Sequence, residues 1–150
     1  MNLAYNAAAW AHIIESTAGT TDLTGVNVID TQNYEGVLFV NIVNTVTAAG
    51  TVRMYPQHSD STSTTDLVSC TGAAFIAGTT ATTTDMTGQV ILLDVYKPQK
   101  RYVGVYVDKA TQATETNVIA IPYGNRKGPI SQSTGQYGVI SAVVAISPTT

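Results

Sequence analysis

Hydrophobic and polar residues alternate with a period of two along most of the chain from residue 26 onward. Successive side chains of an extended strand point to opposite faces, so this alternation predicts half-buried β-strands. Turn-forming stretches of Thr, Ser, Gly and Asp separate the strands at spacings of roughly ten residues, which favours an all-β fold: a β-sandwich, jelly-roll or immunoglobulin-like, of about eight strands. The predicted strands are 26–30, 36–46, 51–55, 67–70, 73–77, 89–96, 101–108 and 117–123.

The segment 36–46 is the clearest predicted strand, and it is apolar on both faces. Such a strand is typical of the centre of a sheet, with one face on the core and the other covered by something else. The turn 48–50 predicts a hairpin whose second strand points Val52 and Met54 inward. Pro56 then ends the ladder or marks an edge. One face of 36–46 carries Leu38, Val40, Ile42 and Val46, and the other carries Val37, Phe39 and Val43.

The segment 101–108 predicts a strand with a valine face and a tyrosine face. Val103, Val105 and Val107 alternate toward the core, whereas Tyr102 and Tyr106 lie on the opposite face. Two exposed tyrosines on one strand would form an aromatic ladder suited to carbohydrate. The alternative is that both tyrosines pack against a neighbouring strand or subunit.

Both ends of the chain carry apolar segments outside this core pattern. Residues 3–15 predict either a short helix, capped by Asn6 with Trp10, Ile13 and Ile14 on one side, or an extended arm. The polar loop 16–25 detaches this segment, which either folds back on its own sandwich or reaches a neighbour. The chain therefore divides into an arm over 1–25, a sandwich over 26–129 and a C-terminal extension over 130–150.

The extension contains a long apolar strand over 137–146. Val139 and Val143 lie on one face of this predicted strand, and Ile140, Val144 and Ile146 lie on the other. A strand that is apolar on both faces is not stable in water. It either completes the sandwich or is buried against another subunit.

Composition agrees with a folded sheet protein and adds an uneven charge. The chain has 150 residues, 11% of them charged, and contains 24 Thr, 17 Val and 11 Ile, all β-branched. Residues 1–96 hold eight acids and one base, whereas residues 97–150 hold six bases and two acids. We interpret this asymmetry as a dipolar surface suited to head-to-tail contacts or to a charged partner, the alternative being solvated turn residues.

Residues suited to catalysis or metal binding are few and scattered. Cys70 is the one cysteine, which excludes an internal disulfide and is typical of a small buried residue.

His58, Ser59 and Asp60 are adjacent, but neighbouring strand residues point to opposite faces, which disfavours a triad. Asp60 and Asp66 flank a hydroxyl-rich loop without the calcium-loop pattern. We predict no catalytic residues, no metal and no cofactor, so the chain is not expected to be an enzyme. His12 is interpreted as a packing or capping residue.

The net charge of −3 and the absence of a basic stripe between aromatic residues disfavour nucleic-acid binding. No apolar stretch approaches the roughly 20 residues of a membrane span. The first basic residue is Arg53, so the N-terminus lacks the positive region of a signal peptide. We expect no membrane partner and synthesis in a cytoplasm.

Four blocks of the chain resemble a group of small β-rich structural proteins of tailed bacteriophages and prophages. The sharpest element is the run Leu-Asp-Val-Tyr-Lys-Pro-Gln-Lys-Arg-Tyr-Val within 90–103. The similarity spans roughly residues 33–129, leaving both ends outside it. The blocks are 33–44, the return strand ending at 57–60, 90–103 and 119–129.

The resemblance implies a non-enzymatic virion component, made in the bacterial host and located in the virion, such as a capsid decoration or cement protein. Its partners would be the major capsid protein, other virion subunits and further copies of itself in a trimer or dimer. A neck or tail component and a glycan-binding module remain as alternatives. The predicted interaction residues are Trp10, Ile13, Ile14, Lys97, Lys100, Arg101, Tyr102, Tyr106, Arg126, Lys127, Val139 and Val143.

Overall fold

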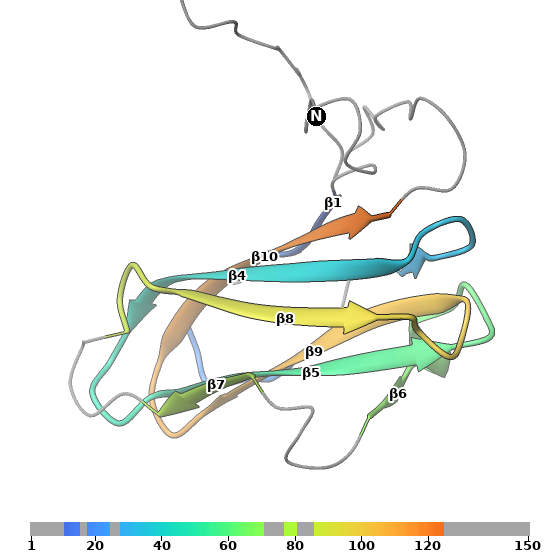
Figure 1. Ribbon diagram of the computed structural model, residues 1–150. Helices are drawn as coiled ribbons and strands as arrows, with labels where there is room; N and C mark the ends of the chain where they lie inside the picture. The colour runs from blue at the N-terminus through green and yellow to red at the C-terminus, as the bar shows by residue number, and fades with distance from the viewer. Residues whose placement is uncertain (1–10, 16–17, 25–27, 71–76, 81–85, 125–150) are drawn as a thin grey trace, which may run out of the picture.

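The protein is a β-sandwich in which two antiparallel sheets enclose one hydrophobic core (Figure 1). The computed structural model describes residues 11–15, 18–24, 28–70, 77–80 and 86–124. The described elements are β1 (Ala11–Glu15), β2 (Leu23–Thr24), β3 (Ile29–Asp30), β4 (Gly36–Val46), β5 (Thr51–Ser59), the 3-10 turn η1 (Thr64–Asp66), β6 (Val68–Ser69), β7 (Ala77–Thr80), β8 (Val90–Tyr96), β9 (Tyr102–Ala110) and β10 (Thr114–Tyr123).

The first sheet has the strand order β1-β10-β4-β8. The second has the order β2-β9-β5-β6, with β3 also paired to β9 and β7 also paired to β5. In Figure 1, β4 and β8 lie above β5 and β9. The sandwich predicted from the alternation is therefore confirmed, and so is the central position of β4 between β10 and β8.

The core is formed by the inward face of each strand. Fully buried side chains come from β4, β5, β9 and β10. The predicted inward residues of β5 and β9 are confirmed, because each of them is fully buried. These core side chains are Val37, Phe39, Val43, Val52, Met54, Val103, Val105, Val107, Val118 and Ala120.

A β-bulge in the pairing of β10 with β4 corrects one predicted side-chain direction. Thr116 pairs with Val43, but Glu115 pairs with Thr45, so Asn44 has no opposite residue. The extra residue turns Val46 to the same side as Val43. Val46 is therefore buried in the core instead of lying with Leu38, Val40 and Ile42 as predicted.

The turn 48–50 does not make the predicted hairpin. It connects β4 in one sheet to β5 in the other, with Ala49 at a φ of 66° and a hydrogen bond of 2.8 Å from Gly50 N to Thr47 O. Sequence alone shows a tight turn between two strands, but it does not show whether those strands pair or face each other across a core. The sheet partners of β5 are β9, β6 and β7 instead.

Pro56 lies within β5 and does not end it, because β5 continues to Ser59 and pairs with β9 along its whole length. On its other side, β5 pairs with β7 over Thr51–Met54 and with β6 from Gln57 onward. The partner changes at the proline, which has no N–H to donate. Residues 78–80, which lie between the predicted strands 73–77 and 89–96, form most of β7.

The N-terminal segment contributes to both sheets. Residues 11–15, for which a helix was one alternative, form β1 and pair with β10. Leu23 and Thr24 form β2 and pair with β9. The described part of the 1–25 arm thus folds back on its own sandwich. Residues 1–10, which include Trp10, lie outside the described residues, as do 125–150.

Candidate functional site

An apolar surface lies on the outer face of the strands β10, β4 and β8. Strand alternation turns every second residue of β10, β4 and β8 away from the core, and about half of these outward residues are aliphatic. We call this surface the outer apolar face and define it by Leu38, Val40, Ile42, Val90, Leu92, Ile119 and Ile121.

The strand register brings these residues together in rows across the sheet. Val40 pairs with Leu92 on one side and with Ile119 on the other. Ile42 lies opposite Val90, and Leu38 lies opposite Ile121. Side chains opposite each other on one face are about 5 Å apart, so the rows form one continuous patch.

Several side chains of the outer apolar face are exposed in the part of the chain that the structure describes. Leu92 is 59% exposed, Val90 is 53% exposed and Ile42 is 36% exposed. Contiguous exposed aliphatic side chains on a folded domain are typical of interaction surfaces. The sequence showed the second apolar face of β4, but it did not identify Val90 and Leu92. The signal was present, because Val90, Ile91, Leu92 and Leu93 make β8 apolar on both faces as well.

Polar groups with fixed partners border the outer apolar face. Tyr123 Oη donates to Asp94 Oδ1 at 2.7 Å, and Asn44 Nδ2 donates to Glu115 Oε1 at 3.1 Å. Burial and the hydrogen bond to Asp94 both raise the pKa of Tyr123, so this phenol stays protonated at neutral pH. The border is therefore polar, and these polar side chains are already hydrogen-bonded to each other, as in the rim of a protein interface.

The predicted basic interaction residues that the structure describes, Lys97, Lys100 and Arg101, all have partners within the chain. Arg101 donates to both carboxylate oxygens of Asp30, at 2.9 and 2.7 Å, and this hydrogen bonding lowers the pKa of Asp30. Lys100 Nζ lies 2.9 Å from Asp60 Oδ2. Lys97 Nζ lies 5.1 Å from the centre of the Tyr96 ring.

Two of these contacts are ion pairs that join the oppositely charged parts of the chain. Arg101 and Lys100 belong to the basic second part of the chain, whereas Asp30 and Asp60 belong to the acidic first part. The fold brings the two parts together, so their charges neutralise each other locally. Lys109, another base of the second part, is buried and donates from Nζ to Thr114 O.

The predicted tyrosine ladder is engaged with other parts of the same sheet. Tyr106 packs edge-on against Tyr55 with ring centres 5.9 Å apart, and its hydroxyl donates to Asp22. The Asp22 hydrogen bond, together with burial, raises the pKa of Tyr106 to about 12. Tyr102 lies under the Arg101 guanidinium, 5.1 Å from the ring centre. These contacts favour the packing alternative over a carbohydrate ladder.

The remaining predicted interaction residues are not described by side-chain contacts. Ile13 and Ile14 lie in β1, of which the structure describes the backbone. Trp10, Arg126, Lys127, Val139 and Val143 lie outside the described residues.

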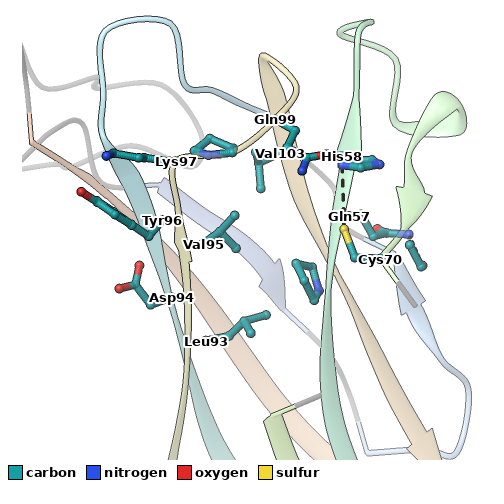
Figure 2. Close-up of a pocket in the computed structure, with 13 residues that line it drawn as sticks. Gln57, His58, Cys70, Leu93, Asp94, Val95, Tyr96, Lys97, Gln99 and Val103 are labelled. Carbon is teal, nitrogen blue, oxygen red and sulfur yellow. Dashed lines mark hydrogen bonds between the residues drawn. The ribbon is translucent and has the colours of Figure 1, made fainter. Parts of the chain in front are cut away.

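A cavity of about 520 Å³ opens between the two sheets at the side of β8 (Figure 2). Leu93 and Val95 point into the space from β8, whereas Asp94 and Tyr96 point away from it. His58 and Cys70 also line the cavity, with Cys70 Sγ 3.8 Å from His58 Nδ1. The lining residues are Pro56, Gln57, His58, Ser69, Cys70, Leu93, Asp94, Val95, Tyr96, Lys97, Pro98, Gln99 and Val103.

The groups at this cavity are not arranged for nucleophilic catalysis. Burial raises the pKa of the Cys70 thiol, which keeps it protonated and weakly nucleophilic. Ser59 Oγ accepts from Ser61 N, and Asp60 pairs with Lys100, so neither is oriented toward His58. Within the described residues, no cluster of three or more His, Cys, Asp or Glu side chains could hold a metal ion.

No protein-family model matches the chain, and no curated protein is similar to it in sequence. In the part of the chain that the structure describes, no helix has the length and apolar character to cross a membrane.

Proposed function

We propose that this chain is a non-enzymatic structural protein of a tailed bacteriophage particle, a decoration protein that binds the lattice of the major capsid protein. The observation that carries the proposal is the outer apolar face, where Leu92 and Val90 remain more than half exposed on a rigid sheet. The sequence resemblance to small phage structural proteins supports the same class of protein. The partner is an apolar patch on an assembled capsid subunit.

Binding through this face stabilises the assembled particle by mass action. Burying a whole Leu or Val side chain contributes roughly 1.5–3 kcal/mol, and about half of that gain is still available at Leu92 and Val90. Each contact is individually weak, but a lattice presents many equivalent sites. A protein that binds the assembled lattice and not the free subunit shifts the equilibrium toward assembly.

Copy number in purified particles tests the proposal directly. The sample is the phage, or the induced prophage, that encodes the chain, and quantitative mass spectrometry measures the chain relative to the major capsid protein. We expect on the order of hundreds of copies per particle, as a lattice requires. About six or twelve copies would indicate a neck or tail ring instead. Absence from the particle would refute a virion role altogether.

A pair of charge substitutions tests the docking face. Leu92→Glu places a carboxylate in the outer apolar face, and Val68→Glu places one on β6 of the other sheet at nearly the same exposure, 58% against 59%. We expect Leu92→Glu to weaken binding to particles stripped of the chain by at least about tenfold, equivalent to about 1.4 kcal/mol. Val68→Glu is expected to bind like the wild type. Equal effects of the two substitutions would exclude this face as the docking surface.

A further inference from the structure

Among the described strands, none pairs with the outer side of the edge strand β8. It is the last strand in the order β1-β10-β4-β8, and among the described strands β4 alone forms a ladder with it. A strand with one unpaired edge offers N–H and C=O groups to another extended segment.

The hydrophobic core is incompletely covered beside this edge. Val37, Phe39 and Val43 of β4 point between the sheets and are fully buried. Ile91 and Val95 of β8 point the same way, one strand further out, but are only partly buried. The difference arises because β4 has a neighbouring strand on each side and β8 has one.

The cavity lies where a further strand beside β8 would place its inward side chains. Leu93 and Val95 form one wall, while Pro56 of β5 and Val103 of β9 contribute apolar surface from the opposite sheet (Figure 2). On the outer side of the same edge lie the exposed Val90 and Leu92. A strand added here therefore has apolar neighbours on both of its faces.

The C-terminal segment 137–146 has the composition that this position requires, because its two alternating sets of residues are both apolar. The chain between β10 and this segment is also long enough to bring the segment to β8. β10 ends at Tyr123, which pairs with Gly36, and Gly36 pairs with Tyr96 at the end of β8. Because β4 lies between β10 and β8, the end of β10 is two strand spacings, or about 10 Å, from the end of β8. The 12 residues from 125 to 136 span up to about 40 Å.

We propose that residues 137–146 of the same chain add to the free edge of β8 as an antiparallel strand, with one alternating set of side chains in the cavity. β8 and β10 both run antiparallel to β4, so a segment that follows β10 must reverse direction to return along β8. Gly124, with a φ of 68°, allows the chain to turn at that point. A tethered segment has an effective concentration in the millimolar range, which favours the chain's own segment over that of a second copy.

Disulfide scanning in the full-length chain tests this pairing. Cys70→Ser removes the native thiol, Leu92→Cys places one thiol on the outward side of β8, and a second cysteine replaces each of residues 139–144 in turn. Opposed residues of neighbouring antiparallel strands have Cα atoms about 4.5–5.5 Å apart, within disulfide range. The matched control moves the β8 cysteine to the equally exposed Val68. After mild oxidation, non-reducing gels and peptide mass spectrometry identify each disulfide and whether it lies within one chain.

The proposal expects a disulfide within one chain between position 92 and the single tail position that lies opposite it, with cross-linking lost at the adjacent tail positions and with Val68→Cys. Cross-linking at every tail position, or at none, would refute a paired strand. Disulfides found only between two chains would refute the assignment to the chain's own segment. None of these outcomes depends on capsid binding, so they are separate from the test of the proposed function.

Discussion

Tyr106 shows how single residues of this fold connect distant parts of the sequence. Its ring lies against Tyr55 of the neighbouring strand, and its hydroxyl donates to Asp22, which precedes β2. Asp22 also accepts from the backbone N–H of Lys109 at 2.9 Å. One carboxylate therefore ties the N-terminal segment to two positions of β9.

The raised pKa of Tyr106 predicts a pH dependence of stability. The folded state holds the phenol protonated up to a pKa of about 12, whereas the unfolded chain releases the proton near a pKa of 10. Stability from this group is therefore fully present below pH 10 and decreases as pH rises from about 10 to 12. We expect Tyr106→Phe to make this decrease shallower, measured as the free energy of unfolding against pH in urea titrations. An unchanged slope would contradict the Asp22 interaction.

At the scale of elements, β8 combines a core face and an outer face in adjacent residues. Leu93 is buried against the core, and Leu92, one residue away, is 59% exposed. The same amino acid therefore serves two purposes in one strand. On the inner face it stabilises the fold, and on the outer face it leaves apolar surface available to a partner.

Alanine substitutions at these two leucines separate the two roles. Leu93→Ala should lower the free energy of unfolding by about 2–5 kcal/mol, because it leaves a cavity in the core. Leu92→Ala should change it by less than about 0.5–1 kcal/mol, because the side chain is mostly in water already. Urea denaturation monitored by circular dichroism measures both. A large loss of stability for Leu92→Ala would mean that its side chain is buried in solution.

At the scale of the whole molecule, folding pairs the acidic and basic parts of the chain. Arg101 with Asp30, Lys100 with Asp60 and Arg53 with Asp108 form ion pairs. The outer apolar face has aliphatic side chains at its centre and hydrogen-bonded polar groups at its border. Association of the protein should therefore depend on burial of apolar surface more than on charge.

Salt dependence tests this conclusion. If the outer apolar face docks on the particle, raising the ionic strength should leave binding unchanged or strengthen it, because screening acts on charges and not on apolar burial. Sedimentation of the labelled chain with particles over a series of salt concentrations measures the effect. Release at moderate salt would instead indicate an electrostatic attachment.

Local patterns were enough to predict most strands and their inward faces. The alternation over 36–46 and 101–108 corresponds to β4 and β9, and Val103, Val105 and Val107 are buried as predicted. The central position of β4 also followed from its two apolar faces. These features depend on the period of two in a strand and on the removal of apolar side chains from water, both of which the sequence carries directly.

Only the tertiary structure decided how the strands are distributed and which surfaces result. It assigned β4 and β5 to different sheets, made residues 11–15 a strand, turned Val46 inward at a bulge and paired Arg101 with Asp30. It also placed Leu92 beside Val40, which creates the outer apolar face. The sequence by itself determined that this protein is a sheet protein with more apolar strand surface than one core needs. Where that surface lies depends on contacts between residues far apart in the chain, which no local pattern encodes.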